Sequence, residues 1–141
     1  MSQYDEKKPE ANNFADLATV WEYNGNKFDL DLGDAADADH AEAAFNHFAA
    51  AEKSLQKDGS IGDVIRGYDK MFRDLYDDLF GPGAGDAVLG DKQNIDNCNR
   101  SYESLLAFID GQNAHFREQM ESLNTRYSGN RAQRRASYRH G

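Results

Sequence analysis

The sequence predicts a small, mainly α-helical domain with a two-stranded β-hairpin at its N-terminal end. An Asn-Gly pair lies between two alternating segments, apolar residues then recur at helical spacing along most of the chain, and 141 residues amount to about one domain. We expect the hairpin to pack on three to four helices as a small helical bundle. This folded part is predicted at residues 16–127, between a flexible arm at residues 1–15 and a basic flexible tail at residues 128–141.

The hairpin centres on Asn24-Gly25. Both central residues of a type I′ turn have positive φ, a conformation that Asn and Gly adopt most easily. The two-residue loop fixes the register, so that Trp21 faces Phe28, and alternation then places the apolar side chains on one face. These side chains are Trp21, Phe28, Leu30 and Leu32. Because an isolated hairpin is marginally stable in water, this face must rest on helices, or the strands must pair with another chain.

Two helices are expected after the hairpin. The first is predicted from Asp37 to Lys57, where acidic residues suit the positive end of the helix dipole. Its apolar stripe consists of Ala41, Phe45, Phe48, Ala49 and Leu55. Ser60, with Asp63 three residues later, predicts the N-cap of the second helix. This second helix has the clearest apolar face of the chain, formed by Ile61, Val64, Ile65, Tyr68, Met71, Phe72, Leu75, Tyr76, Leu79 and Phe80.

The C-terminal half is predicted to contain a short helix and a long one. The sequence GPGAG at residues 81–85 ends the preceding helix, and one short turn of helix is expected at Asp86–Leu89. From Ile95 a single helix of about eight turns is expected to reach Tyr127. The apolar positions that predict it are Cys98, Tyr102, Leu105, Leu106, Ile109, Phe116, Met120, Leu123 and Tyr127.

Charge divides the chain into two parts. The 25 Asp and Glu residues outnumber the 16 Lys and Arg residues, for a net charge of −9. Residues 1–125 carry −14, whereas the last 16 residues carry five arginines and no acid. A surface that coats nucleic acid needs the opposite sign, so we expect no nucleic-acid partner. No apolar run approaches the ~18 residues of a membrane span and the N-terminus is unlike a signal peptide, so we expect no membrane partner and a cytoplasmic location.

No residue pattern predicts an active site, a metal site or a cofactor site. Cys98 has no base at a suitable spacing and is interpreted as a small apolar residue in a helix core. The acids of Asp29–Asp39 fail the calcium-loop pattern, because its sixth position holds Asp34 instead of Gly and its twelfth holds His40 instead of Glu. The histidines lack the spacing of a zinc site. We therefore expect no enzymatic activity and no cofactor.

The C-terminal segment carries Arg131, Arg134 and Arg135 without any acid beside them. A basic segment of this kind suits an electrostatic hook for an anionic partner or for a neighbouring acidic body. A terminal basic run that only improves solubility explains the same residues. Both interpretations stay open at this point.

Three segments, taken in order, resemble a family of small tail assembly chaperone-like proteins encoded by bacteriophages and prophages of Gram-positive bacteria. They are YNGNKFDLDLGDAADADHAEAAF, with its hairpin and acid-Ala helix start, RGYDKMFRDLYDDLFGPGAGDAVLGDKQNIDNCNRSYESLLAFI, with its Phe-Gly turn and Leu-Gly loop, and YSGNRAQRRA. The resemblance extends over residues 20–136. The chain departs from the family at Ser128-Gly129, where Ser-Pro is frequent, and in its longer Ala-rich first helix.

The resemblance implies a non-enzymatic protein that binds the tape-measure protein, a long helical client, and keeps it soluble in the cytoplasm of the bacterial host until the tail tube polymerises. Such a protein needs an apolar groove on a charged body, which we expect between the hairpin and the helices. Candidate partner-binding residues are Trp21, Phe28, Tyr68, Phe72, Arg131, Arg134 and Arg135. Self-association is a further candidate. Two alternatives remain, namely an acidic DNA mimic or regulatory protein-binding module, and a minor structural subunit of the virion.

Overall fold

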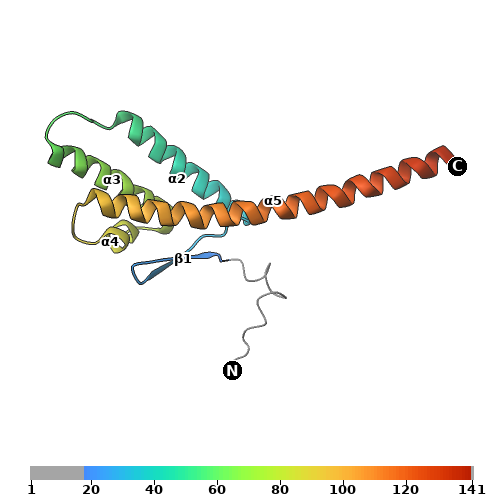
Figure 1. Ribbon diagram of the computed structural model, residues 1–141, viewed down its shortest axis with the longest axis horizontal. Coiled ribbons are helices and arrows are strands. Elements are labelled where there is room, and N and C mark those ends of the chain that lie inside the picture. The colour runs from blue at the N-terminus through green and yellow to red at the C-terminus, as the bar shows by residue number, and fades with distance from the viewer. Residues whose placement is uncertain (1–17, 141) are drawn as a thin grey trace, which may run out of the picture. The chain divides into compact units, whose positions relative to one another are not determined.

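The computed structural model describes the backbone of residues 18–140 and the side chains of residues 18–126. Two strands, β1 (Val20–Tyr23) and β2 (Asn26–Asp29), precede the helices α2 (Ala35–Ser54), α3 (Ile61–Phe80), α4 (Ala84–Leu89) and α5 (Ile95–His140), as Figure 1 shows. The predicted mainly helical fold with an N-terminal hairpin is confirmed. The arm predicted at residues 1–15 lies outside the described residues.

The chain divides into two compact units. Ala18–Gln112 forms one of them, which we call the body, and residues 113–140 of α5, which we call the extension, belong to the other. Helix α5 does not end near Tyr127 as predicted but continues to His140, so the segment predicted as a flexible tail is helical up to that residue. Four arginines and two alanines lie there and proline is absent, so the sequence favours a continued helix, which Gly129 weakens without ending.

The hairpin has the predicted turn and register. Asn24 (φ 51°) and Gly25 (φ 78°) both have positive φ, as a type I′ turn requires. Trp21 lies opposite Phe28 in the antiparallel pair. The apolar side chains therefore share one face.

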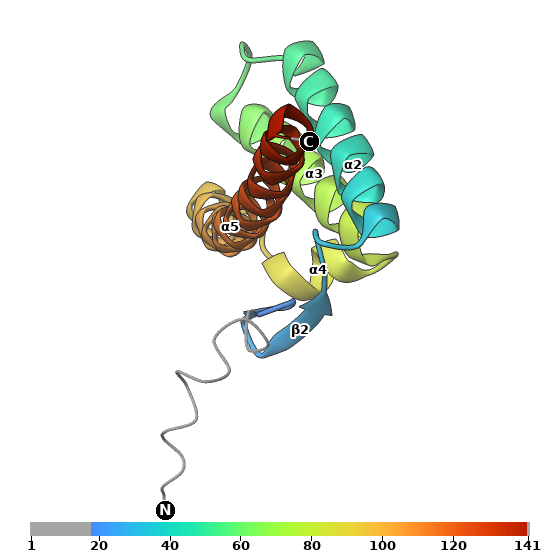
Figure 2. The same ribbon diagram turned by 90° about the vertical axis from the view of Figure 1, so that its right-hand side faces the viewer.

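Two asparagine side chains at the tip of the hairpin cap helix α4. The amide of Asn24 donates to the carbonyl of Val88 at 3.1 Å, and the amide of Asn26 donates to the carbonyl of Ala87 at 3.0 Å. Carbonyls in the last turn of a helix have no partner within the helix, so these two contacts satisfy them. Figure 2 shows the hairpin beside α4 accordingly.

The apolar face of the hairpin is covered by helices of the body. Trp21 is only 2% exposed. Its ring stacks on Tyr76 and on Phe80 of α3, each with a centroid distance of 5.7 Å. The indole Nε1 donates to Ser104 Oγ of α5 at 3.0 Å. The helices of the body therefore stabilise the hairpin.

A single buried amide on α5 closes the base of the hairpin. Gln112 is 3% exposed, and its Nε2 donates to the carbonyls of Ala18 and Leu30 at 2.9 and 2.7 Å. Its Oε1 accepts from the backbone N–H of Leu32 at 2.7 Å. One side chain thus joins both ends of the hairpin to the helix.

Helices α2 and α3 lie side by side in Figures 1 and 2. Asp34 caps α2, and the helix ends at Ser54 rather than Lys57 because Leu55 adopts an extended backbone. Ser60 caps α3 as predicted and accepts from the N–H of Asp63 at 3.0 Å. Not all predicted apolar positions are buried, since Ala49 of α2 is exposed and Ile61, the first residue of α3, is 79% exposed.

Helices α3 and α4 approach each other closely at Gly85. A Cβ atom at this position would lie 2.6 Å from the carbonyl oxygen of Arg73 and 2.7 Å from its Cα. The N–H of Gly85 donates to Asp77 Oδ1 at 2.8 Å. The GPGAG segment, interpreted from the sequence as a helix stop, therefore also supplies the contact that holds α4 on α3.

A buried carboxylate in the same region is paired with a partly buried arginine. Asp69 is 1% exposed, and its carboxylate accepts from Arg73 Nε at 2.6 Å. Arg73 also donates to Asp86 at 2.8 Å and to the carbonyl of Lys92 at 3.1 Å. Removal of one partner would leave the other charge without compensation, which is strongly destabilising.

Candidate functional site

A hollow on the body is lined by three helices and is rich in aromatic side chains. Its volume is about 440 Å³. We call it the three-helix groove. Its lining residues recur at spacings of three, four or seven along each helix, and such spacings place side chains on one helix face. They are Phe48 and Glu52 of α2, Tyr68, Met71 and Phe72 of α3, and Ile95, Asn99 and Tyr102 of α5.

Three rings of the groove form one cluster. Phe48, Phe72 and Tyr102 contact one another, with centroid distances of 5.2 to 5.4 Å. Phe72 is buried, whereas Phe48 and Tyr102 are half-buried and remain partly accessible. Aromatic rings offer a large apolar surface and also attract cationic side chains to their faces.

The groove also has a defined charge. Glu52 and Asn99 are exposed and add a carboxylate and an amide to the lining. Burial raises the pKa of the Tyr102 hydroxyl, and the nearby Glu52 carboxylate adds to this increase. The combination of rings and one carboxylate suits a partner that is apolar and carries basic residues.

The predicted partner-binding residues lie in different parts of the structure. Tyr68 and Phe72 line the groove. Trp21 is a buried core residue and is not accessible to a partner. Phe28 is half-buried and stacks on Phe80 at 4.8 Å. The three-helix groove lies between α2, α3 and α5, whereas the groove was expected between the hairpin and the helices, where rings of α3 stack on Trp21 and Phe28.

The side chains of Arg131, Arg134 and Arg135 lie outside the described residues, although their backbone belongs to α5. Glu52 and Asn99 were not predicted. Ile95, Asn99 and Tyr102 share the spacing of one helix face, which was the available signal.

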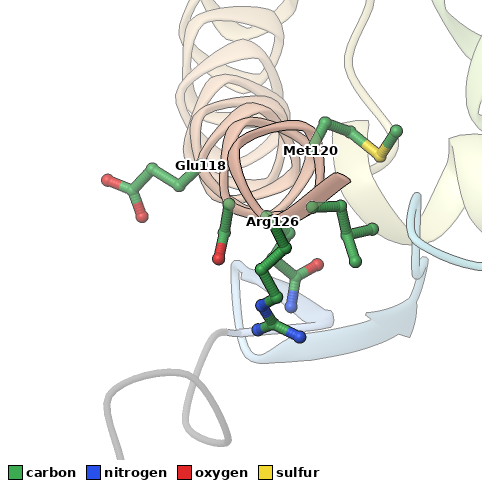
Figure 3. Close-up of a pocket in the computed structure, with 6 residues that line it drawn as sticks. Glu118, Met120 and Arg126 are labelled. Carbon is green, nitrogen blue, oxygen red and sulfur yellow. The ribbon is translucent and has the colours of Figure 1, made fainter. Parts of the chain in front are cut away.

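The extension presents a second apolar surface. Phe116, Met120 and Leu123 are 47%, 39% and 41% exposed, and their i, i+4, i+7 spacing places them on one face, which we call the extension stripe. Figure 3 shows Met120 and Glu118 projecting to opposite sides of the helix. A hollow beside Met120 is lined, among the described residues, by α5 alone.

Cys98 is a core residue, as the sequence indicates. It is fully buried, and its Sγ lies 3.8 Å from Asp69 Oδ1. Burial, with the adjacent carboxylate, raises the pKa of the thiol to about 11. A thiol in this state is not a nucleophile at neutral pH.

The described residues contain no group of three or more His, Cys, Asp or Glu side chains placed to hold a metal ion. His40 and His47 of α2 both contact Asp78 of α3, the first at its carbonyl oxygen and the second at its carboxylate, with His47 Nδ1 at 2.8 Å from Oδ2. These contacts join α2 to α3. No helix in residues 18–140 has the length and apolar character needed to cross a membrane.

One comparison with known proteins is informative. A family described as a family of unknown function (DUF6673) matches residues 24–138, from the hairpin turn to the last turn of α5, and the chain belongs to this family. No curated protein and no solved structure matches the chain.

Proposed function

We propose that this member of the DUF6673 family is a non-enzymatic phage tail assembly chaperone. In this proposal it holds the helical tape-measure protein in the three-helix groove and keeps it soluble in the cytoplasm of the bacterial host. The groove is the observation that carries the proposal. The resemblance of three sequence segments to tail assembly chaperone-like proteins supports the choice of client.

The groove has the properties that a helical client needs. An amphipathic helix binds such a surface through apolar side chains spaced as i, i+3, i+4 and i+7. The half-buried rings of Phe48, Tyr68 and Tyr102 offer apolar area to these side chains, and Glu52 offers a partner to a Lys or Arg beside them. Contacts of this kind are reversible, as the release of a client requires.

Charge pairing on α3 argues against a DNA mimic. A mimic needs an uninterrupted anionic surface, because nucleic acid presents closely spaced phosphates. On α3, Asp63 pairs with Arg66 at 2.6 Å and Asp74 pairs with Lys70 at 2.8 Å. Exposed pairs contribute little to stability, but they interrupt the anionic surface.

Co-expression with the tape-measure protein tests the proposal. Asn99→Trp places a large ring at the groove and should lower the amount of soluble tape-measure protein recovered with the tagged chain. Asn46→Trp is the matched control, because Asn46 is exposed on α2 and does not line the groove. Wild type and the control should retain the client equally.

Two results would contradict the proposal. If the wild type neither retains nor solubilises the tape-measure protein, the chain is not its chaperone. If Asn99→Trp retains as much client as the control, the groove is not the binding site. Detection of the chain by mass spectrometry of purified virions would favour the structural-subunit alternative, because a chaperone should be absent from the finished particle.

A further inference from the structure

We propose that the extension stripe of one copy docks in the three-helix groove of a second copy, so that the protein self-associates through two different surfaces. This inference goes beyond client binding and does not need a client. In this inference the groove is occupied by a helix of a second copy of the protein. The extension stripe, which is not part of the core of the body, thereby has a binding role.

The stripe has the spacing that grooves recognise. Phe116, Met120 and Leu123 occupy positions i, i+4 and i+7, which are the anchor positions of a helix bound in a groove. They span about 10 Å, or two helical turns. All three are more than a third exposed, so they are available as anchors.

The two parts of the chain that contain these surfaces carry opposite net charge. The body, residues 18–112, has 19 acidic and 8 basic residues, whereas residues 113–141 have 6 basic and 2 acidic residues. Arg117 and Arg126 flank the stripe on its two sides, and both are exposed. Glu52 lies in the groove. Complementary charge steers association and fixes the orientation of the partners.

A pairing of two stripes fits the charges less well. In such a pair, Arg117 and Arg126 would take the positions that flank the apolar seam, where coiled coils place charges of opposite sign. The only acids near the stripe, Glu118 and Glu121, lie away from its edges on the helix. In a pair of stripes, arginines of one extension would therefore face arginines of the other. In the groove, they would face Glu52 instead.

The mass of the full-length protein in solution, measured by light scattering over a concentration series, tests the inference. A contact between two different surfaces leads to rings, to open chains, or to a dimer in which each copy places its stripe in the groove of the other. The mass should therefore rise with concentration. Leu123→Ser should weaken the self-association at least about tenfold, which corresponds to about 1.4 kcal/mol. Glu118→Ser, on the opposite side of the same helix, should have no effect.

Charge reversal identifies the surface that receives the stripe. Glu52→Lys should weaken self-association, whereas Glu42→Lys, exposed on the same helix outside the groove, should not. The double variant Arg117→Glu, Arg126→Glu should also weaken it. A mixture of Glu52→Lys with this double variant should associate again, because the charges are then complementary.

Three results would overturn the inference. The first is a wild type that stays monomeric at every concentration. The second is a Glu52→Lys variant that associates like its Glu42→Lys control, which would indicate a pair of stripes. The third is a mixture that does not recover association. None of these results depends on the tape-measure protein, so they are distinguishable from a failure of the chaperone role.

Discussion

Replacement of Gly85 by alanine should destabilise the body, although the same replacement at Gly111 should stabilise it. Both glycines lie within helices, where alanine is favoured by about 1 kcal/mol. At Gly111 a Cβ atom would meet no atom within 4 Å, so this gain should be realised almost fully. The main difference between the two positions is what surrounds the added methyl group.

The expected cost at Gly85 follows from its contacts. The added Cβ would lie 2.6 to 2.8 Å from three atoms of Arg73, two of which belong to the backbone and cannot rotate away. Overpacking of this kind costs about 1–3 kcal/mol, and separation of the helices would also weaken the hydrogen bond from Gly85 to Asp77. After the gain in helix propensity, we expect a net loss of about 1–3 kcal/mol.

Urea unfolding followed by circular dichroism measures both variants against the wild type. The midpoint should decrease for Gly85→Ala and increase for Gly111→Ala, with an unchanged dependence on urea. If Gly85→Ala were as stable as the wild type or more stable, α4 would not be packed on α3 as described. The argument from close approach would then be refuted.

Two further predictions concern buried polar groups. Gln112→Glu should destabilise the protein by about 2–4 kcal/mol, because a carboxylate cannot donate to the carbonyls of Ala18 and Leu30. Asn113→Asp, at the exposed neighbouring position, should change stability by less than about 0.5 kcal/mol. Equal stability of the two variants in thermal unfolding would contradict this prediction. The free energy of unfolding should also decrease between about pH 9 and pH 11. The pKa of the Cys98 thiol is raised from 9.0 to about 11, so in this window the folded state keeps a proton that the unfolded state loses. The resulting loss of stability amounts to up to about 2.7 kcal/mol. Cys98→Ala should remove this part of the pH dependence, which urea unfolding at pH 9 and pH 11 measures. If the variant lost as much stability over this range as the wild type, the assignment to Cys98 would be contradicted.

Features set by neighbouring residues were predictable from the sequence. The Asn24-Gly25 turn determines its own register, and Ser60 caps the helix that follows it, because both depend on contacts within a few residues. The end of α5 was not predictable in this way. The polar residues from Ser128 were interpreted as a flexible tail, but this segment contains no proline, and the helix continues to His140.

Features that need several distant segments were missed. Asp69 lies within the apolar face of α3 and is buried because Arg73 satisfies its carboxylate, a pairing that hydrophobic spacing does not reveal. A groove was expected between the hairpin and the helices, as a chaperone for a helical client would need. The three-helix groove depends on how three helices meet, and the candidates Tyr68 and Phe72 line it.

Photo-crosslinking from the groove tests the central claim most directly. A photoreactive residue at Asn99, in the lining of the groove, should crosslink to co-expressed tape-measure protein, whereas the same residue at the exposed Asn46 on α2 should not. Crosslinked client at Asn99 alone is the result expected from a helix held in the three-helix groove. Equal crosslinking at both positions, or none at Asn99 while the client is still retained, would contradict it.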